Sequence, residues 1–136
     1  MGQASFRKFM VAETVAIAAL AALPARAATS DDCAKPSNPE EIQCLVQTIG
    51  AEQKALEQLY RAALAHMPDA DPTDKRKSKV QLTSAQAAWK VYAEENCAYL
   101  GGQDGGSNSW ATIYSEMCLV DEYQKRIDFF RNPPTF

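Results

Sequence analysis

The sequence has little of what most small enzymes and nucleic-acid-binding domains require. It contains a single histidine, His66, among 136 residues, which excludes most histidine-based metal sites and catalytic triads within one chain. Its formal net charge is -3, so it lacks the basic surface that non-specific binding to nucleic acid requires. We therefore expect no nucleic-acid partner.

Long apolar runs are also scarce. The uninterrupted run Val15–Leu23 is about half as long as the ~20 residues that span a bilayer. Two basic residues precede this run, Pro24 ends it, and Ala25-Arg26-Ala27 has the small-residue pattern of a cleavage site. We expect residues 1–27 to be a secretory signal peptide and residues 28–136 to form one domain.

The exported part of the chain is acidic. Removal of residues 1–27 takes away three basic residues and one acidic residue, so the formal net charge changes from -3 to -5. Cys33 follows Ser30-Asp31-Asp32 instead of a short apolar segment, which argues against a lipid anchor at this cysteine. We expect a soluble periplasmic or secreted protein without stable membrane insertion. On charge alone we interpret its surface as an ordinary soluble one, with attraction of a cationic partner as the alternative.

The cysteines are even in number, and no C-x-x-C pair is present. Cys33, Cys44, Cys97 and Cys118 all lie in the exported part of the chain. An even number of cysteines in a small exported chain is typical of disulfides. A zinc site would need paired cysteines or a suitably spaced histidine, and both are missing. We expect two disulfides, for which three pairings exist, and no metal site.

Three helical segments follow. The first begins at Asn38-Pro39-Glu40-Glu41, with Asn38 as the N-cap and Glu41 as the acid of a capping box, and Pro68 ends it. Its apolar residues recur with a period near 3.6, and Gln53 falls where an apolar residue is expected. This apolar stripe consists of Ile42, Leu45, Val46, Ile49, Leu56, Leu59, Tyr60, Ala63, Leu64 and Met67.

The second segment follows the short basic run Lys75–Lys79, which we interpret as a solvated helix entrance and not as an anion-binding patch. Gly101-Gly102 suit a left-handed cap that ends the helix. Gln86 lies on the inward stripe and should form a hydrogen bond. The stripe consists of Leu82, Ala85, Gln86, Trp89, Ala93, Cys97 and Leu100.

Residues 101–109 are expected to be a flexible connector, because the Lys-Ser/Thr pair and the preceding strand of a phosphate-binding loop are absent. The third helix starts after a cap at Asn108 or Ser109 and ends at Asn132-Pro133-Pro134. Its stripe consists of Trp110, Ile113, Tyr114, Met117, Val120, Ile127 and Phe130.

The aromatic residues at helical spacing are expected in the core rather than at a ligand. They are Trp89, Tyr92, Trp110 and Tyr114. If Trp110 were exposed instead, the neighbouring Gly-rich loop would become the leading contact site for a partner.

No segment alternates with period two, so we predict an all-α fold, a small antiparallel three-helix bundle braced by two disulfides. Short connections place the start of the first helix, the end of the second and the start of the third at one end of the bundle. Cys44, Cys97 and Cys118 belong near that end, and Cys33 precedes the first helix. This arrangement favours the pairs Cys33–Cys44 and Cys97–Cys118.

The usual signatures of an enzyme are missing. Glu94 and Glu95 are adjacent, and successive helical positions point about 100° apart, so these carboxylates do not face one another across a cleft. His66 belongs to the last turn of the first helix, where its charge suits the helix C-terminus. With both disulfides formed, no cysteine is free to act with it. We expect no catalytic residue and no cofactor.

With these residues placed, the chain resembles the lysozyme inhibitor LprI family of bacterial envelopes. The most specific part of the family pattern is the spacing from Gln-x-x-Trp to a cysteine, here Gln86, Trp89 and Cys97. The resemblance covers roughly Cys33 to Arg131. The further matches are Cys33, Cys44, Leu56, Tyr60, Leu82, Ala85, Ala88, Gly105-Gly106-Ser107, Cys118 and Arg126.

The resemblance implies a protein that blocks a muramidase by protein–protein contact, without catalysis. Lysozymes are typically basic, so the acidic exported chain would favour encounter with one. The alternative is a structural or adaptor module that binds another envelope protein. For either function the candidate partner contacts are Gly105, Gly106, Ser107 and Trp110.

The chain departs from the family pattern at several polar positions. The departures are Gln53, Glu57, Ala93, Glu94 and Tyr123. The resemblance therefore implies that an Asp–Arg contact between helices is missing here. Either the core is looser, or a different polar set replaces this contact. That set consists of Gln53, Glu57, Gln86 and Arg126.

Overall fold

The structure, a computed structural model, describes residues 29–133 except 36, 70–77 and 105. A short 3-10 helix, η1 (Ser30–Cys33), precedes three long helices, α1 (Asn38–His66), α2 (Lys79–Asp104) and α3 (Asn108–Arg131). This part of the chain contains no strand, which confirms the all-α prediction. The expected signal peptide and most of the basic run 75–79 lie outside the described residues.

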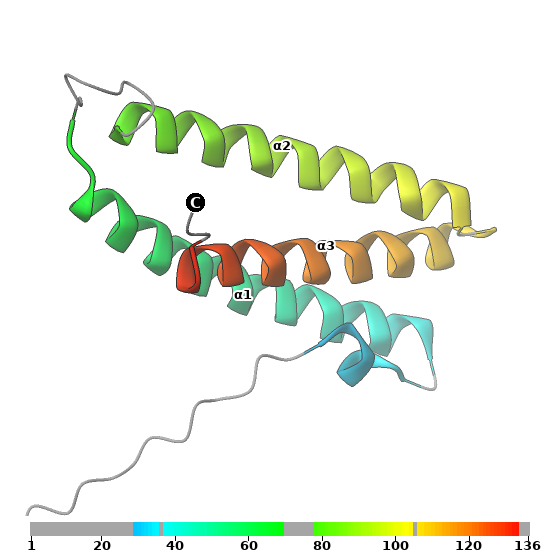
Figure 1. The fold of residues 1–136 in the computed structure, drawn as a ribbon. Helices are drawn as coiled ribbons and strands as arrows, with labels where there is room; N and C mark the ends of the chain where they lie inside the picture. Colours follow the sequence, from blue (N-terminus) through cyan, green and yellow to red (C-terminus); the bar gives the residue numbers. More distant parts are fainter. Residues whose placement is uncertain (1–28, 36, 70–77, 105, 134–136) are drawn as a thin grey trace, which may run out of the picture.

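The central helix of the bundle is α3. It packs against both α1 and α2, whereas α1 and α2 do not pack against one another along their lengths. The chain reverses direction at each connection, so α2 runs antiparallel to its two neighbours, as predicted (Figure 1). Within the described ranges, none of these helices is sufficiently long and apolar to cross a membrane.

Two helices begin one residue or more before the predicted position. Ser37, and not Asn38, is the N-cap of α1, and its hydroxyl donates a hydrogen bond to Oε2 of Glu40 at 2.8 Å. Glu40 therefore stands at the third helical position expected for Glu41, but the predicted capping box is absent, because Ser37 forms no side-chain cap to the backbone. Ser107 is the N-cap of α3. Both serines have the extended backbone conformation of an N-cap residue. Residue preferences alone do not identify which of several neighbouring polar residues is the N-cap.

The predicted end of α2 at Gly101-Gly102 is wrong. The helix continues to Asp104, and no described glycine has a positive φ, so there is no left-handed cap. Gly101 is buried against α3, where an added Cβ would collide with the backbone oxygen of Ala111 and lie 2.8 Å from Cβ of Ser115. The glycine therefore permits a close approach of two helices instead of ending one.

The largest part of the core lies between α1 and α3. Its fully buried side chains include Leu45, Ile113 and Val120. The apolar stripe predicted for α1 needs two corrections. Val46 is exposed, and the buried polar residue is Glu52, not Gln53. Glu52 follows Ile49 by three residues and precedes Leu56 by four, so helical spacing places it on the buried face.

Both predicted disulfides are present. Cys33–Cys44 joins η1 to α1, and Cys97–Cys118 joins α2 to α3; the Cα atoms are 5.4 Å apart in each pair. No cysteine is free. The second bridge and Gly101 fasten the end of α2 to the start of α3. At the other end of α2, the backbone N–H of Lys79 donates a hydrogen bond to the carbonyl oxygen of Pro68 at 3.0 Å.

Candidate functional site

Several family-motif residues meet at a polar cleft between α1 and α2, with α3 as its floor. The cleft has a volume of about 210 Å³. We call it the motif cleft, and it is lined by Gln53, Leu56, Glu57, Gln86, Trp89, Lys90 and Tyr123. The structure thus brings together three of the family-motif residues and three of the departures from the family pattern.

Two hydrogen bonds connect α3 to its neighbours at the motif cleft. Nε2 of Gln53 donates to the hydroxyl of Tyr123 at 3.0 Å, and Nε of Arg126 donates to Oε1 of Gln86 at 2.9 Å. The prediction that Gln86 forms a hydrogen bond is confirmed. Three members of the expected polar set, Gln53, Gln86 and Arg126, therefore form bonds between helices.

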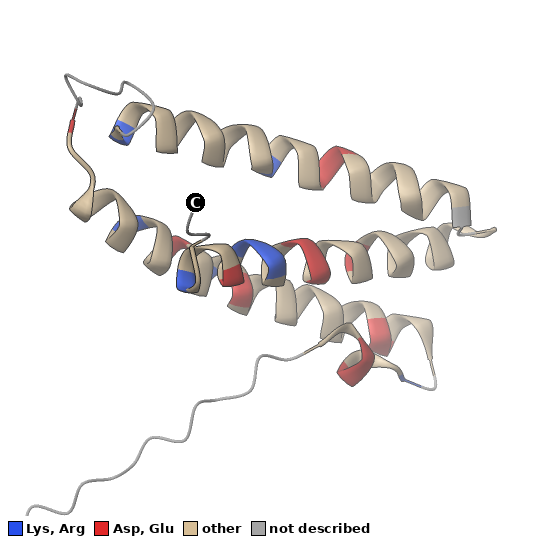
Figure 2. Ribbon diagram, in the orientation of Figure 1, with Lys and Arg blue, Asp and Glu red and all other residues tan. Residues whose placement is uncertain are grey.

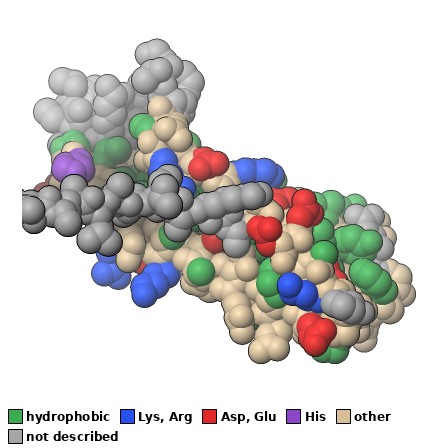
Figure 3. All heavy atoms as spheres, turned by 90° about the horizontal axis from the view of Figure 1, so that it is seen from below, with side chains coloured by type: hydrophobic (Ala, Val, Ile, Leu, Met, Phe, Trp, Pro, Cys, Tyr) green, Lys and Arg blue, Asp and Glu red, His purple; other side chains and the backbone are tan. Residues whose placement is uncertain are grey.

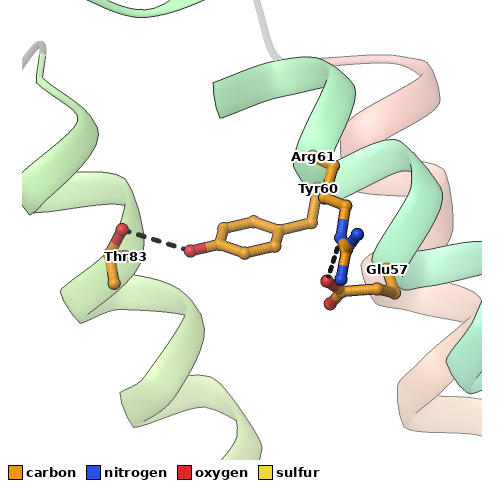
Figure 4. A network of polar contacts seen from close by, with 4 residues as sticks. All are labelled: Glu57, Tyr60, Arg61 and Thr83. Atoms are coloured by element: carbon orange, nitrogen blue, oxygen red, sulfur yellow. Dashed lines mark hydrogen bonds and ion pairs between the residues drawn. The ribbon is translucent and has the colours of Figure 1, made fainter. Parts of the chain in front are cut away.

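Glu57, the fourth member of that set, does not link two helices. Its Oε1 pairs with Nε of Arg61 at 2.6 Å on the same helix, and both side chains are exposed (Figure 4). Tyr60 instead reaches across from α1 to α2, where its hydroxyl donates to Oγ1 of Thr83 at 3.1 Å (Figure 4). The motif tyrosine is therefore a direct polar link between α1 and α2.

Arg126 packs among aromatic rings. Its guanidinium carbon lies 4.8 Å from the ring centroid of Phe129, 5.1 Å from that of Phe130 and 5.5 Å from that of Trp89. Partial burial lowers the pKa of Arg126 from its ordinary value, but an arginine remains charged at neutral pH. Phe129 and Phe130 belong to the same helix as Arg126, whereas Trp89 belongs to α2, so the cation–π contact with Trp89 helps to hold α2 on α3.

A buried carboxylate lies between α1 and α3. Glu52 is 6% exposed, its Oε1 accepts a hydrogen bond from Nε2 of Gln124 at 3.0 Å, and its Oε2 has no partner among the described residues. Burial raises the pKa of Glu52 to about 7, although the bond from Gln124 opposes this shift. The described ranges contain no group of three or more His, Cys, Asp and Glu side chains that could hold a metal ion.

An apolar cavity opens where α1 ends and α2 begins. Its volume is about 290 Å³, and it is lined by Ala63, His66, Met67, Leu82, Phe129, Phe130 and Pro133. The motif residue Leu82 lies here and not in the motif cleft. Tyr60 lies close to this cavity, because its ring meets that of Phe130 edge-on with 6.2 Å between centroids.

The expected partner contacts lie at the opposite end of the bundle. Gly106 and Ser107 are exposed between α2 and α3, and Gly105 lies outside the described residues. Trp110 is 45% exposed and Tyr114 is 41% exposed, so the expectation that they belong to the core is wrong. Neither α1 nor α2 covers their side of α3.

The same correction applies to Tyr92, which is exposed on α2. Trp89 behaves as expected, because it is partly buried and packs against the core. Its ring meets that of Tyr123 edge-on, with 5.3 Å between centroids. The helical spacing in the sequence does not distinguish the partly buried Trp89 from the exposed aromatic residues, because α2 and α3 each have a side that no other helix covers.

Charge is distributed unevenly along the bundle (Figure 2). One half contains η1, the start of α1, the end of α2 and the start of α3. In its described residues between 29 and 50 and between 94 and 117, every charged side chain except Lys35 is acidic. These side chains are Asp31, Asp32, Glu40, Glu41, Glu94, Glu95 and Glu116. We call this half the acidic half, and it also carries the exposed Trp110 and Tyr114.

The surface view agrees with this distribution. Hydrophobic side chains gather at that end of the molecule, with acidic side chains beside them (Figure 3). The opposite half carries most of the basic side chains, including Arg61, Lys79 and Arg131. The negative charge that would attract a cationic protein and the exposed aromatic rings therefore lie at the same end of the bundle.

Comparison with known proteins agrees with the residue pattern. The family model described as Lysozyme inhibitor LprI matches residues 31–130. No curated protein and no solved structure matches the chain. The matched range contains both disulfides, the motif cleft and almost the whole of the three helices. The chain therefore belongs to the lysozyme inhibitor LprI family.

Proposed function

We propose that this protein binds a lysozyme outside the cytoplasm, in the periplasm or after secretion, and blocks its muramidase activity by contact. The observation that carries the proposal is membership of the lysozyme inhibitor LprI family over residues 31–130. The two disulfides support the location, because such bonds persist in oxidising compartments. The signal peptide expected at residues 1–27 supports it further.

The charge of the protein supports encounter with a basic enzyme. The exported chain has a formal net charge of -5 once the expected signal peptide is removed, and the acidic half concentrates this charge. Attraction between opposite charges raises the association rate, and salt screens it over about 10 Å at an ionic strength of 0.1 M. A bundle held by disulfides also presents a preformed surface, which reduces the entropy lost on binding.

The arrangement of reactive groups supports binding without catalysis. Glu94 and Glu95 are exposed at successive positions of α2, and His66 is exposed at the end of α1. All four cysteines are in disulfides. The carboxylate of Glu52 is buried against Gln124 and does not line the motif cleft.

An inhibition assay tests this function. The exported, oxidised protein is titrated into cell-wall lysis assays with lysozymes of several structural types, at low and at raised salt. We expect inhibition at micromolar or lower concentration that weakens as salt rises, and no inhibition after reduction and alkylation of the disulfides. Unchanged lysis with every lysozyme at micromolar protein would contradict the proposal.

The apolar cavity favours a second candidate, an envelope adaptor that holds an apolar segment of another protein. Its lining combines Leu82 of α2 with Phe129 and Phe130 of α3, and grooves of this kind accept the apolar face of a helix or peptide. Recovery of one abundant envelope protein that Phe129→Ala abolishes, without any effect on lysozymes, would favour this function.

A further inference from the structure

We propose that four exposed aromatic side chains form the surface on which this protein docks a cationic protein. They are Tyr92 and Tyr99 of α2 and Trp110 and Tyr114 of α3, and we call them the aromatic face. The identity of the partner as a basic lysozyme rests on the proposed function. The location of the surface rests on geometry and charge.

The two residues from α3 form a pair. Trp110 and Tyr114 are one helical turn apart, with 6.0 Å between ring centroids and an interplanar angle of 31°. Trp110 and Tyr114 come directly before Ala111 and Ser115. These two residues lie against Gly101 of α2. The pair therefore lies at the edge of the contact between α2 and α3.

The two residues from α2 share one face of that helix, because Tyr92 and Tyr99 are seven residues, or about two turns, apart. Tyr99 is 63% exposed. The disulfide Cys97–Cys118 and the packing of Gly101 hold this part of α2 against the start of α3. The end of α2 and the start of α3, which carry these aromatic residues, are therefore held in place relative to one another.

Both pairs lie on the same side of the bundle. Trp89 of α2 and Lys125 of α3 line the same cavity, and Tyr92 follows Trp89 by three residues on α2, so Tyr92 lies on the side of α3 that carries Lys125. Nζ of Lys125 pairs with Oε1 of Glu122 at 2.8 Å. Tyr114 precedes Lys125 by eleven residues, about three turns, so the two share one face of α3. The side of α3 that Tyr92 approaches is therefore the side that carries Tyr114.

Acidic side chains lie beside the aromatic face on both helices. Glu95 follows Tyr92 by three residues on α2, and Asp121 lies between Tyr114 and Lys125 on their shared face of α3. The one lysine at the margin, Lys125, is already paired with Glu122.

Aromatic rings within a negative field suit a cationic protein surface. Lysine and arginine of a partner gain both attraction from the carboxylates and cation–π contacts with the rings. Tyrosine and tryptophan are also the residues that contribute most to protein–protein interfaces. The same field disfavours phosphate groups of nucleic acids or anionic lipids.

The test compares the double variant Trp110→Ala/Tyr114→Ala with the control Val80→Ala. Val80 is an apolar residue that is 73% exposed, and it lies at the start of α2, at the opposite end of the bundle. Dissociation constants are measured by calorimetry for a basic lysozyme and for a basic protein without muramidase activity. Circular dichroism establishes that each variant is folded. We expect the double variant to weaken binding at least tenfold and Val80→Ala to weaken it less than threefold.

A charge variant tests the role of the acidic residues. Glu95→Lys should slow association and reduce the dependence of binding on salt, because it reverses a charge beside Tyr92. Equal affinities of the double variant and the wild type would overturn the docking surface, and inhibition by both would then leave the proposed function intact. Binding through the aromatic face without inhibition of any lysozyme would support the surface and contradict the function. No binding to either basic protein would overturn both.

Discussion

Single polar residues on the buried faces decide how the helices are held together. Gln86 on the inward stripe of α2 had to find a partner, because a buried amide without one costs about 1–3 kcal/mol. The sequence predicted that bond but not its partner Arg126, which lies forty positions away on α3. The partner depends on the relative register of two helices, which no local pattern contains.

Replacement of Gln86 tests this contact. Gln86→Ala should lower the free energy of unfolding by about 1–2 kcal/mol, because the partly buried guanidinium of Arg126 loses an acceptor. Urea denaturation measures the change. Gln81→Ala, at an exposed position of the same helix, is the control and should change the value by less than about 0.5 kcal/mol. Equal effects of the two substitutions would refute the assignment.

The buried Glu52 should make the stability of the protein depend on pH. Its pKa is raised from 4.5 to about 7 in the folded state, so the folded protein binds more protons than the unfolded chain between these values. The free energy of unfolding therefore falls as pH rises from about 4.5 to about 7 and remains lower above this range. We expect a loss of about 3 kcal/mol from this group.

Glu52→Gln removes the titrating group with little change in shape. We expect the variant to be more stable than the wild type at pH 8 and to show a flatter profile between pH 5 and pH 8, measured by urea denaturation. Glu57→Gln is the control, because Glu57 is exposed and its pairing with Arg61 lies on the surface. If Glu52→Gln keeps the slope of the wild type, burial does not control the ionisation of Glu52.

At the scale of elements, the period of the apolar residues predicted the positions of all three helices. The residues at which the helices end depend also on contacts with neighbouring helices. Glycine pairs commonly end helices, which made Gly101-Gly102 a reasonable prediction for the end of α2. The surface of α3 gives Gly101 a different role, because Ala111 and Ser115 occupy the space that a side chain would need. The contact between the two helices outweighs the tendency of glycine to end them.

The two adjacent glycines give a matched pair of substitutions. Gly101→Ala should lower the free energy of unfolding by about 1–3 kcal/mol, because its Cβ would force α2 away from α3. Gly102→Ala meets nothing within 4 Å and should raise the value by about 0.5–1 kcal/mol through helix propensity. Thermal and urea denaturation measure both changes. A gain in stability for both variants would show that α2 and α3 are not in close contact there.

At the scale of the whole molecule, the arrangement with α3 in the centre leaves α1 and α2 supported mainly from one side. The core between α1 and α3 is small, and part of its buried surface belongs to the polar Glu52. A small core supplies limited stability, so small exported domains commonly depend on disulfides. The same arrangement leaves one side of α2 and α3 open, which is where the aromatic face lies.

Removal of a disulfide should therefore be costly. Cys97→Ala/Cys118→Ala opens the longer loop, with a sequence separation of 21 against 11 for the other pair. Each bridge should contribute about 3 kcal/mol by restricting the unfolded chain, and the longer loop slightly more. Urea denaturation of each double variant and of the reduced wild type measures this contribution. Unaltered stability after reduction would show that packing alone holds the bundle.

The sequence by itself determined the helical class, the approximate extent of the three helices and the pairing of the cysteines. These features follow from hydrophobic period, capping residues and the short connections between helices, all of which are local. The tertiary structure alone decided which side of each helix is covered. It thereby placed Glu52 inside, Trp110 and Tyr114 outside, and Gly101 at a contact between helices. Burial depends on the packing of segments far apart in the chain, and a helical period does not specify how much of each face a neighbour covers.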